Sequence, residues 1–134
     1  MLLECVTPVP NCLRQKSDKN WEEGNHCLKS GMIDAAASRL YYAVFEAVYG
    51  FGIHNKDATI DSPVGTEKSK HALAIAIVKT HRSSHTRYFI TLKGLRIRAD
   101  YRPESVNREQ ITDELMTKIA NIREYFINIT GSEL

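Results

Sequence analysis

The chain of 134 residues lacks several features that would assign it to a familiar class. No apolar run approaches the roughly 18 residues of a membrane-spanning helix, so we predict no membrane segment. The first residues, MLLECVTPVPNCL, have neither a cationic start nor a sustained apolar stretch, unlike a signal peptide. Cys5, Cys12 and Cys27 form no CxxC pair, and an odd number of cysteines favours reduced thiols in a cytoplasmic protein.

The sequence also has little that would hold a metal ion or a cofactor. His26 and Cys27 are adjacent, but no second pair of ligands stands at the spacing of a zinc site. No glycine-rich loop follows a predicted strand, and the alternation in ALAIAIV is explained equally well by a short helix. We therefore predict no metal and no cofactor.

The composition is typical of one globular domain. The chain is 43% hydrophobic and 25% charged, and a chain of this length can bury a proper core. We expect a single domain over 1–134, with 1–14 as an irregular N-terminal segment.

Hydrophobic periodicity predicts helices nearly throughout, at 15–30, 34–52, 67–81, 86–101 and 107–131. Gly31 is a plausible helix stop, Asp34 suits a helix start, and Pro103 should end the fourth helix at the residue before it. Asn107 and Gln110 have the spacing of a capping box. The segment 54–66 is rich in turn formers and is predicted to be a loop. These elements favour an all-α, up-and-down bundle of four to five helices.

Positive charge is concentrated in the middle of the chain. Residues 66–102 carry nine Lys or Arg against two acidic residues, which gives +7, whereas the remainder carries nine against fourteen, which gives −5. Such asymmetry is typical of a surface that binds a polyanion or an acidic partner, and also of the solvent side of two ordinary helices.

Two motifs, separated by KSKHALAIAIV, resemble the HEPN family (higher eukaryotes and prokaryotes nucleotide-binding domain). The motifs lie in AAASRLYYAVFEAVYG and LRIRADY. The residues that carry the resemblance are Ser38, Arg39, Tyr41, Tyr42, Ala43 and Phe45, followed by Arg96 or Arg98 and then Ala99, Asp100 and Tyr101.

The resemblance implies a compact helical bundle, often paired as a homodimer. Many members are metal-independent ribonucleases, and many are toxins encoded beside a nucleotidyltransferase partner. Their usual motif is an arginine, which stabilises the scissile phosphate, followed a few residues later by a histidine, which moves protons. Both roles suit cleavage by the RNA 2′-hydroxyl.

This chain has Tyr101 where that histidine would follow Arg96. A tyrosine has a reference pKa of about 10, so binding survives this replacement more easily than cleavage does. The catalytic candidates are Arg96, Tyr101 and His71, which lies near the start of the third helix. His81 and His85 are expected at the opposite end of the fourth helix from Arg96.

The candidates for binding a nucleotide or RNA are Arg39, Tyr42, Arg96, Arg98 and Asp100. Arg39 fits either phosphate binding or a structural pair with a carboxylate such as Asp100, and the structural pair is favoured. Three functions stay open: an RNA- or nucleotide-binding component of a toxin–antitoxin pair, an active metal-independent ribonuclease, and a non-catalytic dimeric interaction module.

Overall fold

The computed structural model of the protein describes residues 11–55 and 67–128. Within these ranges the chain is all-helical and forms no β-strand, as the periodicity predicted. The α-helices are α1 (Asn11–Lys29), α2 (Ile33–Asn55), α3 (Glu67–His81), α4 (Thr86–Tyr101) and α5 (Asp113–Asn128), with short 3-10 helices η2 (Ser83–His85) and η3 (Arg108–Gln110). In this part of the chain, every helix is too short or too polar to span a lipid bilayer.

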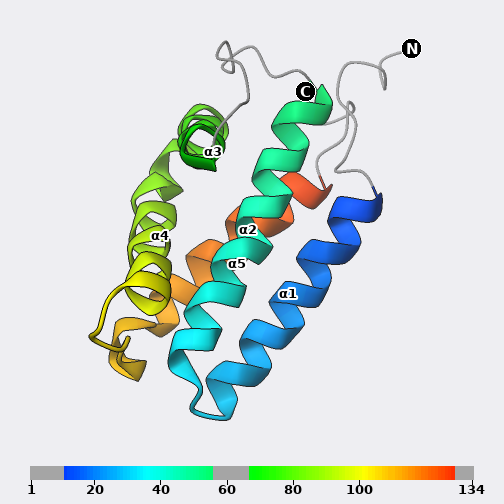
Figure 1. The fold of residues 1–134 in the computed structure, drawn as a ribbon. Coiled ribbons are helices and arrows are strands. Elements are labelled where there is room, and N and C mark those ends of the chain that lie inside the picture. The colour runs from blue at the N-terminus through cyan, green and yellow to red at the C-terminus, as the bar shows by residue number, and fades with distance from the viewer. Residues whose placement is uncertain (1–10, 56–66, 129–134) are drawn as a thin grey trace.

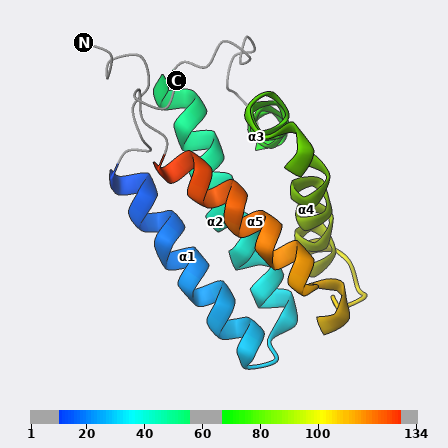
Figure 2. The ribbon, with the colours of Figure 1, turned by 180° about the vertical axis from the view of Figure 1, so that it is seen from behind.

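The helix α2 is the centre of the bundle and contacts each of the other four α-helices (Figure 1). Its neighbour α1 runs antiparallel to it, and the view from behind shows α5 lying over α2 (Figure 2). The helix α3 is seen nearly end-on in both figures, so it lies across the other helices. The bundle is therefore not strictly up-and-down.

The tight turn between α1 and α2 is built on Gly31. This residue has a φ of 80°, a conformation that side chains with a Cβ disfavour. The Met32 amide donates to the carbonyl of Cys27 at 2.9 Å, the pattern that closes a helix at a left-handed residue. The predicted helix stop at Gly31 is confirmed. Earlier in α1, Gly24 lets α1 and α2 approach closely, since a Cβ at this position would lie 2.8 Å from Leu40 of α2.

The core comes from one face of each surrounding helix and most of α2. One face of α5 belongs to the core, because Leu115, Ile119, Ile122 and Phe126 are all buried. The largest fully buried side chains are those of Tyr41, Phe51, Phe89, Phe126, Leu40, Ile77, Leu92, Ile111, Ile119, Ile122 and Val44. Most of the described residues of α2 are buried, and the sequence of this helix is correspondingly hydrophobic on nearly every side.

The first and second helices each have one limit that was predicted wrongly. The first helix begins at Asn11, within the segment 1–14 that was expected to be irregular; residues 1–10 lie outside the described part. The second continues through Gly50 to Asn55, because Phe51 packs in the core and this packing outweighs the low helix propensity of glycine. The rest of the predicted 54–66 loop and the end predicted at Gly131 lie outside the described residues.

The segment after α4 ties the end of that helix to the start of α2. Arg102 is extended, with φ −111° and ψ 152°, as expected before Pro103. Val106 is buried, and its amide donates to Oδ1 of Asp34 at 2.7 Å. Asn107 and Gln110 form the predicted capping box, but it begins η3, and α5 starts only at Asp113.

Candidate functional site

Arg96 lies at the centre of the candidate site, near the C-terminal end of α4. The residue is only 5% exposed. Its guanidinium carbon lies 5.2 Å from the ring centre of Tyr41, 5.4 Å from that of Tyr42 and 5.6 Å from that of Tyr101. A cation so close to three aromatic rings is stabilised by their electron-rich faces, an effect that grows as water is excluded. The three tyrosines therefore form a cage around Arg96.

The polar partners of Arg96 are few for a buried arginine. Its Nη1 pairs with Oδ2 of Asp100 at 3.6 Å, the i, i+4 pair that the sequence allowed. Its Nε is buried and has no hydrogen-bond partner. Asp100 also accepts a long hydrogen bond of 3.4 Å from the hydroxyl of Ser38, on α2. A guanidinium carries five N–H donors, so the cage leaves Arg96 incompletely paired.

His71 belongs to the same cluster through Tyr41. The residue is 4% exposed, and its Nδ1 lies 2.6 Å from the Tyr41 hydroxyl, with which it shares a hydrogen bond. Its ring also packs 4.6 Å from the ring centre of Phe45. His71 is buried although it lies near the start of a helix, because α3 packs this part of its length against α2. His71 and Arg96 both contact Tyr41, on α2.

Arg39 forms a structural pair with a carboxylate, as the sequence analysis favoured, but the partner is Glu23 and not Asp100. Its side chain is 54% exposed and pairs with Glu23, on α1, at 3.4 Å. The same Nη1 donates to Oδ1 of Asn20 at 3.1 Å, and Asn20 in turn donates to Glu46 at 3.0 Å. Burial raises the pKa of Glu46, and the Asn20 bond opposes this rise. Arg39 therefore holds α2 to α1 rather than to α4.

An open groove, here called the inner groove, lies between α1, α2 and the end of α4. Its volume is about 550 Å³. Three of the predicted binding residues line it, namely Arg39, Tyr42 and Asp100. The complete lining among the described residues is Asn20, Asp34, Ala35, Ser38, Arg39, Tyr42, Ala99 and Asp100.

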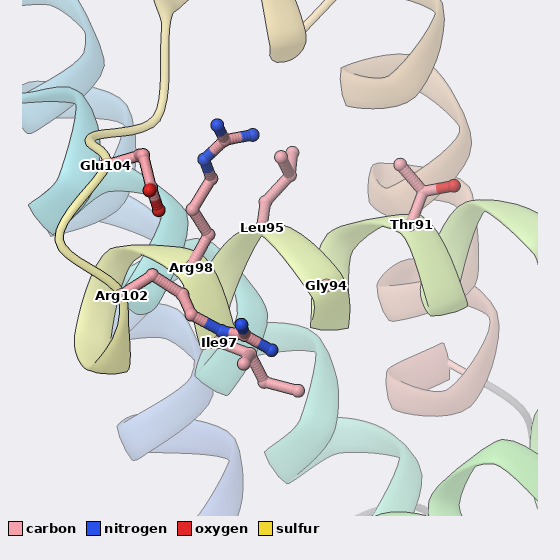
Figure 3. Close-up of a pocket in the computed structure, with 7 residues that line it drawn as sticks. All are labelled: Thr91, Gly94, Leu95, Ile97, Arg98, Arg102 and Glu104. Atoms are coloured by element: carbon pink, nitrogen blue, oxygen red, sulfur yellow. The ribbon is translucent and has the colours of Figure 1, made fainter.

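A second groove, here called the outer groove, follows the solvent side of α4 and has a volume of about 510 Å³. The residues that line it are Thr91, Gly94, Leu95, Ile97, Arg98, Arg102 and Glu104 (Figure 3). Gly94 leaves the helix surface open, since nothing lies within 4 Å of where its Cβ would be. In Figure 3, Arg98 points away from the helix on the same side as Leu95. Residues two positions apart on a helix point about 200° apart, so the predicted binding residue Arg98 is on the other side of α4 from Arg96.

Tyr101, the last residue of α4, is 71% exposed and is not among the residues that line either groove. It follows Asp100 of the inner groove directly, and on the helix surface it neighbours Ile97 and Arg98, four and three residues earlier. Among the described residues, the other large hydrophobic side chains with high exposure are Met32 at 54% and Ile90 at 49%. Ile90, which precedes Tyr101 by three helical turns, lies on the same face of α4.

His81 and His85 lie at the other end of α4, as the sequence predicted. His85 is buried, and burial together with the charges of Arg82 and Lys118 lowers its pKa. Within the described ranges, no group of three or more His, Cys, Asp or Glu side chains could hold a metal ion.

The structure thus brings most of the predicted residues to one end of α4. One cluster contains Arg96, Tyr42, Asp100 and Tyr101, and His71 joins it through Tyr41. Arg98 and Arg39 flank this cluster on opposite sides. The prediction omitted Tyr41, Asp34 and Arg102 as site residues. Tyr41 and Tyr42 stand together in the first motif, and only the packing of α2 against α4 decides that both contact Arg96.

Comparison with known proteins gives no relative for this chain: no family model matches it, nor does any curated protein or solved structure.

Proposed function

We propose that the protein is an HEPN-like helical bundle that binds single-stranded RNA or a nucleotide at the C-terminal end of α4. The observation that carries this proposal is the exposure of Tyr101, at 71%, beside the arginines of the outer groove. An exposed aromatic ring among arginines is the usual means of holding single-stranded nucleic acid, because the ring stacks on a base while the cations contact the phosphates.

Arg98 and Arg102 are suited to the phosphate contacts. Both line the outer groove, Arg98 from within α4 and Arg102 from the extended residue that follows its end, and Glu104 is the only acidic residue among the described lining residues. In this proposal a strand lies along α4 with its phosphates at the two arginines and a base on the outer face of Tyr101.

Arg96 has a positioning role in this proposal. It is almost completely buried, and three tyrosine rings surround its guanidinium, so the contact it offers is to the rings. A cation behind the ring of Tyr101 holds that ring at the helix end and leaves its other face to solvent.

Binding is better supported than cleavage. Of the three predicted catalytic residues, Arg96 and His71 are each at most 5% exposed, and His71 is hydrogen-bonded to Tyr41. Tyr101 alone reaches solvent, and a phenol is a poor general base near neutral pH. A ribonuclease would need the cage to open before a phosphate could reach Arg96.

The test is equilibrium binding of a short, single-stranded RNA at several salt concentrations. Arg98→Ala should weaken binding and reduce the slope of log K against log salt by about 0.7, the value for one phosphate contact in a single strand. Tyr101→Ala should cost about 1–3 kcal/mol of binding free energy, whereas Tyr101→Phe should bind almost as the wild type does.

Arg14→Ala provides the matched control, because this exposed arginine lies on α1, away from both grooves. The proposal fails if Arg14→Ala and Arg98→Ala reduce binding equally, or if the folded wild type binds no RNA. RNA cleavage in EDTA that disappears in Tyr101→Phe would instead favour the ribonuclease.

The resemblance also supports two predictions about partners, a homodimer and a complex with a nucleotidyltransferase of the antitoxin type. Sedimentation equilibrium of the purified chain tests the first. Co-expression with a nucleotidyltransferase encoded beside it, followed by purification through a tag on one chain, tests the second.

A further inference from the structure

The inner groove has the wrong charge for a phosphate. Its described lining includes the carboxylates of Asp34 and Asp100 and one cation, Arg39. That cation is already engaged with Glu23 and Asn20. A groove with a net negative lining repels a phosphate, so the inner groove suits a different part of a nucleotide.

Asp34 and Asp100 both offer the inner groove carboxylate oxygens that accept hydrogen bonds. Oδ1 of Asp34 accepts the Val106 amide, but its Oδ2 has no hydrogen bond or ion pair within the described part of the chain. Oδ2 of Asp100 has two long contacts, to Ser38 at 3.4 Å and to Arg96 at 3.6 Å, and its Oδ1 has none. An ionised carboxylate only accepts hydrogen bonds. The inner groove therefore favours a ligand edge that donates them.

The walls of the inner groove fit a flat ring. Tyr42 is half-buried and contributes an aromatic surface, and Ala35 and Ala99 are small residues on the two helices that form the walls. Arg96 lies 5.4 Å from the centre of the Tyr42 ring, which restrains that ring in place. Bases stack well on such a surface whatever their identity, so the hydrogen-bonding edge decides which base is preferred.

We propose that the inner groove binds a guanine base of the RNA, with its Watson–Crick edge donating to Asp100 and its ring against Tyr42. Guanine carries the N1–H and the 2-amino group side by side, two donors that match one carboxylate. Adenine, cytosine and uracil each present an acceptor beside a donor on that edge. This inference rests on the proposed function, and it adds base selectivity to the phosphate contacts of the outer groove.

The experiment compares five pentanucleotides, UUGUU, UUAUU, UUCUU, UUUUU and UUIUU, where I is inosine. They carry the same number of phosphates, so differences in affinity report the central base. The wild type should bind UUGUU at least about fivefold more tightly than UUAUU, UUCUU and UUUUU. UUIUU, which lacks the 2-amino group, should fall between them.

Asp100→Asn should abolish this preference, because an amide replaces one acceptor oxygen by a donor. Glu22→Gln is the matched control, since this exposed carboxylate on α1 lines neither groove and its loss should leave the preference unchanged. Because Asp100 also pairs with Arg96, the melting temperature of Asp100→Asn must be measured. If that variant is unfolded, Asp34→Asn, which keeps the oxygen that Val106 contacts, should reduce the preference instead.

Two negative outcomes are distinguishable. Equal, salt-sensitive binding of all five RNAs would overturn guanine selection and leave the proposed RNA binding intact. No binding of any of them by the folded wild type would overturn both. A preference for guanine that persists in Asp100→Asn and in Asp34→Asn would place its cause outside the inner groove and would also overturn the inference.

Discussion

Arg96 and Arg123 are both nearly buried, with side chains 6% and 11% exposed, yet their surroundings differ. Arg123, on α5, donates through Nε to Ser17 at 2.9 Å, forms an ion pair with Asp18 and lies over the ring of Trp21. Ser17 is itself bonded to the carbonyl of Ala43. These contacts join α5 to α1 and α2. Arg123 is a structural clamp.

Arg96 has three aromatic neighbours, one long ion pair and a buried Nε without a partner. A buried charge with incomplete hydrogen bonding contributes little to stability, because its desolvation is only partly compensated. The comparison teaches that burial alone does not identify a structural arginine. A structural arginine is identified by hydrogen-bond partners for its N–H donors, and Arg96 lacks several of these. Arg96 lies at the end of the bundle where Tyr101 is exposed.

The largest expected effect is at the clamp. Arg123→Met should lower the free energy of unfolding by about 2–3 kcal/mol, since it removes a charged pair and leaves the hydroxyl of Ser17 with one partner fewer. Urea denaturation measures this difference. Arg14→Met, at an exposed position on α1, is the control and should change stability by less than about 0.5 kcal/mol.

The next largest effect is expected in the cage. Tyr41→Phe removes the 2.6 Å hydrogen bond to His71 while keeping the ring that contacts Arg96. Loss of a buried hydrogen bond should cost about 1–2 kcal/mol. The exposed Tyr101→Phe is the matched control, and a stability loss of equal size in both variants would contradict the importance of the Tyr41–His71 bond.

A third prediction concerns His85, a buried basic side chain that, unlike an arginine, can lose its charge. The folded pKa of His85 is lowered below its ordinary value of 6.5 by burial, Arg82 and Lys118, so the unfolded chain binds its proton more tightly. Its contribution to stability should therefore be present above pH 6.5 and be lost as the pH falls through that value toward the folded pKa. Thermal melting of the wild type and of His85→Gln between pH 7.5 and 5 measures it, and the variant should show the weaker pH dependence. Parallel curves would rule His85 out as the cause.

The smallest effect is expected at Arg96 itself. Arg96→Met keeps an unbranched side chain in the cage and should change the free energy of unfolding by less than about 1 kcal/mol, because replacing an incompletely paired buried charge by an apolar group is often neutral. The measurement is the same urea denaturation as for Arg123→Met. If both substitutions cost the same, the distinction between the clamp and the cage is wrong.

Helix limits were predictable where the sequence carries an explicit signal. The helices at 67–81 and 86–101 have the predicted ends, and Gly31 and Pro103 act as expected. The end of α2 was not predictable, because Gly50 and Gly52 are poor helix formers that only the packing of Phe51 retains in a helix. The partners of Arg39 were missed for a related reason, since the exposed side chain meets α1 before it can reach α4.

The site divides in the same way. Local sequence determines that the end of α4 is basic and aromatic. It also determines that Arg96 and Arg98 point in different directions, because residues two positions apart on a helix are rotated by about 200° about its axis. It does not determine which of the two is buried. The packing of α4 on α2 decides that Arg96 enters a cage of tyrosines and that Arg98 lines an open groove. The physical reason is that a helix has a fixed period, whereas its rotation about its own axis is set by the surfaces it packs against.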